Sequence, residues 1–378
     1  MTGGKAYYIK ESEANEITLR NLHLVERNDK VGLNKIVNDL IGIHSSRFKS
    51  PIFSLFCRKN FDSINSYFKN IYQNNELYRI RCMRGTLHIL DFEDAIISHK
   101  ATLNQRLKTC DYLIRKLDLT NNQIELLCNK ILESLEKKPK NTYELLSDIY
   151  LGKKYISVFE NKALKIGLRF LWEKGMLIRR NQSDHWETEN SIYSINDNRI
   201  WFESLNEIST NYAEEILILK YFKSYGPATL EDAYWWSNIN ISRIKQIISK
   251  NSNTIIQVRI SNCNRNYFIH SLAFDNRNKI ELCNNVRLLA YEDNLLKGYK
   301  ISRDRFVNQE HMNLVYNPAG EANASILVNG KIIGIWKHNL KNNTIHTIMF
   351  EKIKKTDNDL LKIEFERLKC LLDAKTEK

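Results

Sequence analysis

One order of elements occurs in the middle of the chain, and it limits the folds that the chain can adopt. In residues 121–200, three helical segments with apolar periodicity follow one another: "NNQIELLCNKILESLEKKP", "NTYELLSDIY" and "ENKALKIGLRFLWEKGML". The next stretch, "MLIRRNQSDHWETENSIYSI", reads as two extended segments around a polar turn. The pattern therefore predicts three helices followed by a β-hairpin.

Residues 211–270 repeat this order. A helix in "YAEEILILKYFKSYG" ends at Gly226, a second begins in "PATLEDAYWWSN" with Thr229 as its N-cap, and "NISRIKQIISKN" forms a third. A pair of strands around a polar turn follows in "TIIQVRISNCNRNYFIHSL". Three helices and a hairpin are the order of a winged helix. The two stretches share order and length more than residues, so we interpret them as a structural repeat.

The flanking regions have different patterns. Residues 15–120 are mostly helical, with a clear apolar stripe in "LNKIVNDLIGI" and a helix start predicted at Ser50 (N-cap) and Pro51. Strands with period two dominate 275–350, where Asn329-Gly330 is a hairpin turn signal, and an amphipathic helix ends the chain. We expect an α+β protein with units at 1–120, 121–210, 211–272 and 273–378.

Composition narrows the class of protein. The 378 residues carry a net charge of +13, which favours a polyanionic partner, most often nucleic acid, over an anionic membrane surface. Such a charge also occurs in proteins that use it only for solubility. No apolar run is long enough for a transmembrane helix, and the start does not read as a signal peptide. The seven scattered cysteines lack zinc-site spacing, so we expect a cytoplasmic protein without a metal or cofactor.

The stretch "GIHSSRFKSPIFSLFCR", residues 42–58, places chemically capable side chains at a junction between two helices. His44 can act as an acid or a base near neutral pH, and Ser46 could anchor a water molecule or orient the imidazole. A serine before a helix is also an ordinary cap. The residues alone leave both interpretations open: a capped helix start and an active site.

Four further stretches occur in a characteristic order: "MRGTLHIL", "YGPATLEDAYWW", "LLAYEDNLLKGYKISRDR" and "ILVNGKIIGIWK". Together they resemble the AlkZ and YcaQ type of winged-helix DNA glycosylases, and the resemblance runs from about residue 15 to 372. It implies three tandem winged-helix units followed by a C-terminal β-domain with a terminal helix, wrapped into a C-shaped, basic DNA channel. It also implies cleavage of the N-glycosidic bond of a modified base.

The resemblance assigns the catalytic motif. The family carries Gln-x-Gln or Gln-x-Asp after a Gly-apolar dipeptide, and here His44 and Ser46 stand at those two positions. Glutamines suffice when a cationic alkylpurine leaves, whereas a neutral base needs acid–base help. We therefore expect a monofunctional glycosylase for a neutral, bulky modified base, in defence against phage with hypermodified DNA or, alternatively, in repair of bulky, alkylated or crosslinked bases. Asp293 could support the sugar cation.

The expected partner is double-stranded DNA with a modified base, bound by a monomer without any membrane contact. We expect arginines to bind its phosphates or line the pocket, at Arg47, Arg84, Arg179, Arg180, Arg259 and Arg265. The hairpin that carries two of them also offers Trp186, and wings of this type commonly probe the minor groove. The alternative from another class is a DNA-binding regulator without catalysis, which has no need of a polar pocket at His44.

Overall fold

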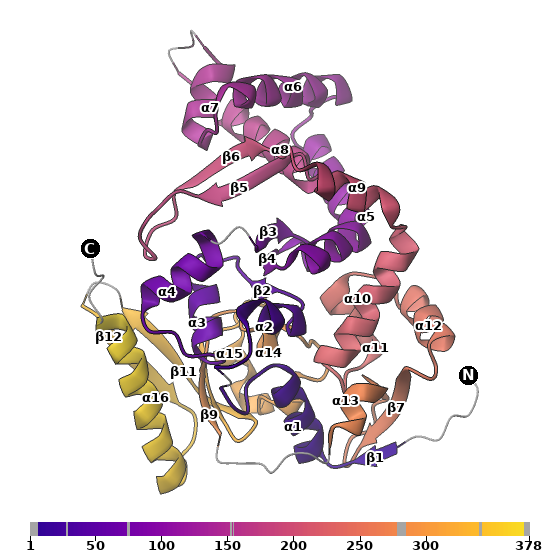
Figure 1. Cartoon of the computed structure of the whole chain (residues 1–378), viewed down its shortest axis with the longest axis vertical. Helices are drawn as coiled ribbons and strands as arrows, with labels where there is room; N and C mark the ends of the chain where they lie inside the picture. The colour runs from indigo at the N-terminus through magenta and orange to yellow at the C-terminus, as the bar shows by residue number, and fades with distance from the viewer. Residues whose placement is uncertain are drawn as a thin grey trace.

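Residues 33–90 contain three helices and a small antiparallel sheet (Figure 1). The computed structural model describes residues 7–27, 29–73, 76–151, 153, 155–277, 285–339 and 342–373. Along residues 33–90 the elements are α2 (Leu33–Asp39), β2 (Ile43–His44), α3 (Ser50–Phe56), α4 (Ile64–Phe68), the π-helix η1 (Lys69–Gln73), β3 (Tyr78–Arg81) and β4 (Leu87–Leu90). Strand β2 pairs with β4, and β4 with β3.

Helix α3 begins one residue earlier than the sequence indicated. Ser50 is its first helical residue and Lys49 takes the N-cap position, without a side-chain cap hydrogen bond. Pro51 lies in the first turn, where its missing N–H costs no helical hydrogen bond.

The predicted order of three helices and a hairpin is present in residues 121–195. The elements are α6 (Asn121–Lys137), α7 (Thr142–Ile149), α8 (Val158–Glu173), β5 (Leu177–Asn181) and β6 (Ser191–Ile195). Capping boxes at Thr120, Asn141 and Ser157 start all three helices, because each side chain accepts from a backbone N–H that the helix leaves free. Just before α7, Lys140 pairs with Tyr193 of β6.

The same order is confirmed in residues 210–270. The elements are α10 (Thr210–Ser224), α11 (Leu230–Ser237), α12 (Ile241–Lys250), β7 (Ile255–Ile260) and β8 (Tyr267–His270). Thr229 caps α11 as predicted, and Ala228 before it pairs with Phe268 of β8, the counterpart of the Lys140 bridge. Strand β1 (Tyr7–Ile9) adds to this sheet in parallel beside β7, and α1 (Glu11–Asn21) follows it. No pattern in the sequence indicated that pairing.

A four-stranded antiparallel sheet forms the C-terminal part, in the order β12-β11-β10-β9. Its strands are β9 (Val286–Leu289), β10 (Ser325–Val328), β11 (Lys331–Asn339) and β12 (Thr344–Met349), and α16 (Lys355–Asp373) packs on β9. The turn at Asn329-Gly330 has two positive φ angles, 47° and 83°, which is the hairpin geometry that this dipeptide predicts. The short helix α13 (Ser271–Asp275) lies between β8 and β9 in sequence, and α14 (Asn294–Lys297) and α15 (Met312–Val315) lie between β9 and β10.

The long helix α5 (Phe92–Lys116) packs on both α8 and α10, and α9 (Arg199–Glu207) leads from one helical segment to the next (Figure 1). One apolar core joins residues of the 33–90 segment, α10, α11, the C-terminal sheet and α16. A second core fills the 114–195 segment. The architecture is therefore α+β, as expected. Among the described residues, no helix is long and apolar enough to cross a membrane.

Candidate active site

A tight turn brings His44 into the interior. Ile41 and Gly42, just before it, both have positive φ angles, 52° and 82°. A Cβ on Gly42 would lie 2.7 Å from Leu90 Cγ and 3.0 Å from the Ile89 carbonyl oxygen, so only glycine fits between α2 and strand β4. The Gly-apolar dipeptide of the motif is thus explained by close backbone packing.

His44 is 3% exposed, whereas Ser46 is exposed at the surface. The Ser46 Oγ lies 3.5 Å from His44 Nε2, so the two predicted motif residues are brought together. Glu292 Oε2 lies 3.4 Å from the same nitrogen. His88 packs edge-on against the imidazole, and His44 Nδ1 is buried without a protein hydrogen-bond partner.

Glu292 is a candidate site residue that the sequence analysis did not single out. It is buried; its Oε1 accepts a hydrogen bond from the Ala322 N–H, and its Oε2 lies 3.0 Å from Lys297 Nζ. Its φ of 61° is unusual for a residue other than glycine, and such strained residues gather at functional sites. The adjacent carboxylates of Glu292 and Asp293 were the available signal, but the side that each faces cannot be read from the sequence.

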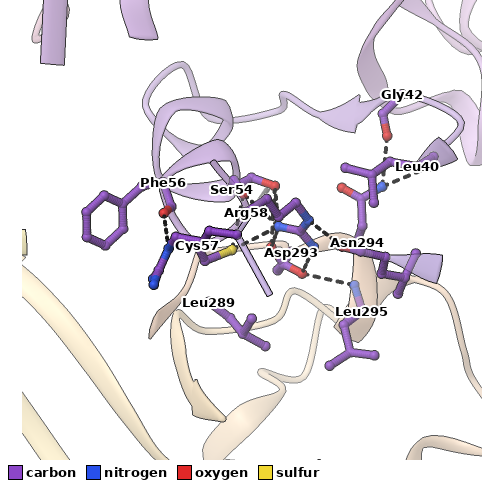
Figure 2. A network of polar contacts seen from close by, with 12 residues as sticks. Leu40, Gly42, Ser54, Phe56, Cys57, Arg58, Leu289, Asp293, Asn294 and Leu295 are labelled. Atoms are coloured by element: carbon purple, nitrogen blue, oxygen red, sulfur yellow. Dashed lines mark hydrogen bonds and ion pairs between the residues drawn. The ribbon is translucent and has the colours of Figure 1, made fainter. Parts of the chain in front are cut away.

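Asp293 lies in a different environment from the one expected. Its carboxylate forms a bidentate ion pair with Arg58, with both N–O distances 2.8 Å, and neither side chain is exposed (Figure 2). Oδ1 also accepts from the Leu295 N–H and thereby caps α14. Because both oxygens are engaged in this buried pair, Asp293 holds α3 against the C-terminal part and leaves the approach to His44 to Glu292.

Asn294, the next residue, fixes the turn before His44. Its Nδ2 donates to the carbonyl oxygens of Gly42 (2.8 Å) and Leu40 (3.3 Å), as Figure 2 shows. The Tyr225 hydroxyl donates to the same Leu40 oxygen at 2.7 Å. The run of residues 292–294 therefore supplies one neighbour of His44 and two anchors for the elements on either side of it.

Several positively charged side chains lie close to the buried His44 ring. Arg84, expected to contact DNA or the pocket, has its guanidinium 4.0 Å from the Trp235 ring centre and donates to the Lys297 carbonyl oxygen. Arg303 lies 5.0 Å from the same ring, and both arginines have a buried nitrogen without a partner. Burial lowers the pKa of Arg84 to about 10. Glu292 is the carboxylate that lies among these cations.

This environment keeps His44 neutral. Burial, followed by the charges of His88, Arg84 and Lys297, lowers the pKa of His44 well below 6.5. Burial and Arg84 likewise lower the pKa of His88 to about 3. A neutral imidazole carries one proton, and the Glu292 carboxylate, 3.4 Å from Nε2, favours the tautomer with that proton on Nε2. The free lone pair then belongs to Nδ1, so His44 is equipped to accept a proton rather than to donate one.

Three of the arginines named from the sequence are open to solvent. Arg47 is 60% exposed, lies 3.8 Å from the Glu321 carboxylate and stacks on the Tyr291 ring, with its guanidinium 3.7 Å from the ring centre. Arg180 and Arg259 are also exposed. These positions are compatible with phosphate contacts, because their guanidinium groups are not buried in the fold.

The other two lie beside carboxylates of the protein itself. Arg179 is 3.1 Å from Glu189, and Arg265 forms a bidentate pair with Asp304 at 2.7 Å. Each carboxylate neutralises part of the positive charge that a DNA phosphate would meet.

A cleft of about 910 Å³ opens beside the motif. The loop of residues 47–50 forms one wall, the β5–β6 hairpin contributes Glu187 and Glu189, and strands β11 and β12 form another wall. Trp336, Phe53 and Tyr291 give it aromatic surfaces, and Asn317, Asn323, His338 and His346 give it hydrogen-bonding groups. Among the described residues, no group of three His, Cys, Asp or Glu side chains could hold a metal ion.

Comparison with known proteins identifies relatives of this arrangement. The family model described as "DNA glycosylase AlkZ-like" matches residues 37–369. The "Interstrand DNA cross-link repair glycosylase" of Streptomyces sahachiroi is 22% identical over 268 residues, which cover 69% of this chain and 70% of that protein. The solved structure of the Streptomyces sahachiroi DNA glycosylase AlkZ superposes with a TM-score of 0.76 at 17% identity, over 97% of both chains.

The buried ion pair gives a first prediction. Asp293→Asn leaves the Arg58 charge uncompensated in the interior, so we expect the free energy of unfolding to fall by about 3–5 kcal/mol. Removing the exposed pair between Arg199 and Glu203 by Arg199→Ala should change it by less than about 1 kcal/mol. Urea denaturation of both variants measures this difference. Equal losses of unfolding free energy in the two variants would show that the buried ion pair contributes no more to stability than the exposed one.

The buried histidines give a second prediction, in pH. A histidine that stays neutral in the fold disfavours folding once the unfolded chain is protonated, so stability should fall as the pH drops below about 6.5. Each such histidine contributes a slope of about 1.4 kcal/mol per pH unit. Asp94, whose pKa burial raises to about 6, acts in the opposite direction.

Comparison with His88→Gln isolates one histidine and cancels the contribution of Asp94. Between pH 6 and pH 5, which lies below the unfolded pKa of about 6.5 and above the folded pKa of about 3, the variant should lose stability less steeply than the wild type. Unfolding curves across this range test the slope. Parallel slopes would mean that His88 takes up a proton in the folded protein.

Proposed function

The chain belongs to the AlkZ-like DNA glycosylase family and is a DNA glycosylase, and from this premise we propose that it hydrolyses the bond between deoxyribose and a neutral, bulky modified base. The observation that carries the proposal is the neutral, buried His44, with a carboxylate at Nε2 and an unpartnered Nδ1. The product is DNA with an abasic site. No lysine is assigned as a covalent nucleophile, so the activity is monofunctional, without strand cleavage.

DNA binding is assigned to three tandem winged helices. Segments 33–90, 121–195 and 210–270 each contain a helix, a short extended residue or strand, two helices and a hairpin, and in each the short extended part pairs with the last strand. This shared order supports the proposal that the three units and the C-terminal sheet form a C-shaped channel for double-stranded DNA. Arg47, Arg180 and Arg259 would contact phosphates in it.

The chemistry follows from the proton positions. The target base leaves the stack, since its glycosidic bond is poorly reachable inside a duplex. A water molecule adds its oxygen to C1′ and gives a proton to His44 Nδ1, while the electron pair of the C1′–N bond leaves with the base. The departing base takes up a proton from solvent, and His44 gives the proton at Nδ1 back to solvent, so the overall hydrolysis balances. Glu292 stabilises the imidazolium that forms, and Ser46, which lies near Nε2, helps to hold the ring.

A neutral base is the leaving group that most needs this help. An alkylated purine is already cationic, so groups that merely position water suffice for it, as the usual glutamines do. The cleft of about 910 Å³ beside Arg47 supports a bulky base, because its aromatic and amide walls suit a large polar substituent. Hypermodified bases of phage DNA have both properties, so we propose antiviral defence by a monomeric, cytoplasmic enzyme.

Repair of crosslinked or alkylated bases is the second candidate setting. The Streptomyces sahachiroi relative is by name an interstrand cross-link repair glycosylase, and this favours repair. The presence of His44 and Ser46, in place of the glutamines of the usual motif, favours a different leaving group. Parallel assays on crosslinked DNA, N-alkylated DNA and DNA with neutral bulky pyrimidines separate the two settings.

Substitution of His44 tests the assigned base. His44→Ala should slow release of a neutral modified base by about 10²–10⁴-fold, the usual worth of a general base, with DNA affinity retained. His44→Gln should release the neutral base as slowly as His44→Ala does. On a cationic N-alkylpurine, His44→Gln should be at least as active as the wild type. Single-turnover rates with binding measured separately give the answer. A fully active His44→Ala enzyme would exclude His44 as the base.

Narrowing the cleft tests where the substituent binds. Ala324→Phe adds a ring to the cleft wall, and we expect it to slow release of a bulky base by about tenfold or more, a typical effect of a lost pocket contact. Release of a small modified base by the same variant is the matched control and should not change. Equal slowing of both substrates would place the substituent elsewhere.

A further inference from the structure

Arg79 of β3 links the β5–β6 hairpin to the residue between His44 and Ser46. Its Nη2 donates to the Ser45 carbonyl oxygen at 2.9 Å, and its Nε donates to Ser45 Oγ at 3.3 Å. Its Nη1 donates to Glu189 Oε1 of the hairpin at 2.6 Å. The Arg79 side chain is 9% exposed, whereas Glu189 lies at the surface, so Arg79 connects an exposed carboxylate to the interior of the motif.

The hairpin is docked on the catalytic segment by apolar contacts as well. Trp186 in its loop is buried in the main core, although the sequence suggested a side chain that probes DNA. Its ring lies edge-on to Phe53 of α3 at 6.3 Å, and Lys49 Nζ is 5.0 Å from its centre. The hairpin of the second unit therefore rests on α3, the helix that follows the motif (Figure 1).

Glu189 is ionised and shared. Burial opposes its charge, but Arg79 and then Arg179 outweigh burial and lower the pKa of Glu189. Ser191 Oγ donates to the same Oε1 at 2.9 Å, and Arg179 lies 3.1 Å away. Arg79 and Arg179 thus have the same carboxylate partner, yet of the two only Arg79 is bonded to the motif.

We propose that Arg79 is a positioning residue that fixes the His44–Ser46 segment, and that the β5–β6 hairpin acts on catalysis through Glu189 and Arg79. This inference rests on the proposed function of His44. It makes the rate of base release depend on a segment of the second unit that does not itself reach His44. The hairpin holds the His44–Ser46 segment in position, in addition to any contact that it makes with DNA.

The geometry around Ser45 explains why the Arg79 contacts affect the reaction. The Ser45 carbonyl belongs to the peptide unit that joins Ser45 to Ser46, and the Ser45 N–H is held by Leu87 of β4 at 2.8 Å. Releasing one side of Ser45 lets this peptide unit rotate, which moves Ser46 away from His44 Nε2. Misplacement of a reacting group by about 1 Å costs on the order of 10²-fold in rate.

Arg79→Gln and Arg179→Gln form a matched pair for the test, because both remove a cationic partner of Glu189. Single-turnover base release, affinity for DNA and hydrogen–deuterium exchange of residues 42–48 are measured in the full chain. Arg79→Gln should slow release by about tenfold to 10²-fold with DNA affinity unchanged, and should speed exchange in residues 42–48. Arg179→Gln removes the other cationic partner of Glu189 but no bond to Ser45, so exchange of residues 42–48 in this variant should stay as in the wild type.

Equal exchange of residues 42–48 in the two variants would overturn the proposal, as would unchanged exchange in Arg79→Gln. If Arg79→Gln does not fold, Glu189→Gln takes its place: it should slow release more than Arg179→Gln does, and equality of those two is again the contrary result. Hydrogen–deuterium exchange of residues 42–48 is measured without a substrate. A wild-type protein that releases no base would therefore refute the proposed function, whereas the exchange data would still test the positioning role of Arg79.

Discussion

The ion pair between Arg58 and Asp293 is the interaction on which the arrangement of the site depends. It joins the end of α3, just after the catalytic motif, to the start of α14, just after Glu292. Two fully buried charges are costly to desolvate, and here every oxygen of Asp293 and all three guanidinium nitrogens of Arg58 have hydrogen-bond partners. All of these hydrogen bonds form together in one arrangement of the N-terminal and C-terminal parts. In that arrangement Asn294 reaches the Gly42 carbonyl and Glu292 reaches His44.

The charges around His44 then set its chemistry. Burial and the cations below the ring remove the proton that histidine would carry in acid solution, and Glu292 gives the remaining proton a place at Nε2. The account therefore assigns to His44 the role of a base, whereas the sequence left acid and base open. In the proposed mechanism the supporting carboxylate is Glu292, one residue before the expected Asp293, whose own carboxylate is engaged by Arg58.

Much of the fold could be predicted because its signals are local. Helical periodicity, the Thr229 cap and the Asn329-Gly330 turn act within a few residues, and they gave the order of the elements. The motif could be placed because a resemblance supplied what local patterns lack. What could not be predicted depends on distant partners: β1 beside β7, Glu189 beside Arg79, Asp304 beside Arg265 and Trp186 in the core. Nor does a sequence show which of two adjacent buried carboxylates faces His44, since this depends on the left-handed backbone at Glu292.

Mass spectrometry of the small molecules released from defined duplexes tests the central claim most directly. The wild-type protein is incubated with duplexes that differ only in one base: unmodified, N-alkylated, or a neutral pyrimidine with a bulky polar substituent. The account predicts that the intact bulky base is released in stoichiometric amount with an abasic site and an unbroken strand, and that unmodified DNA yields nothing. Release of the alkylated base alone, or of no base from any duplex, would contradict it.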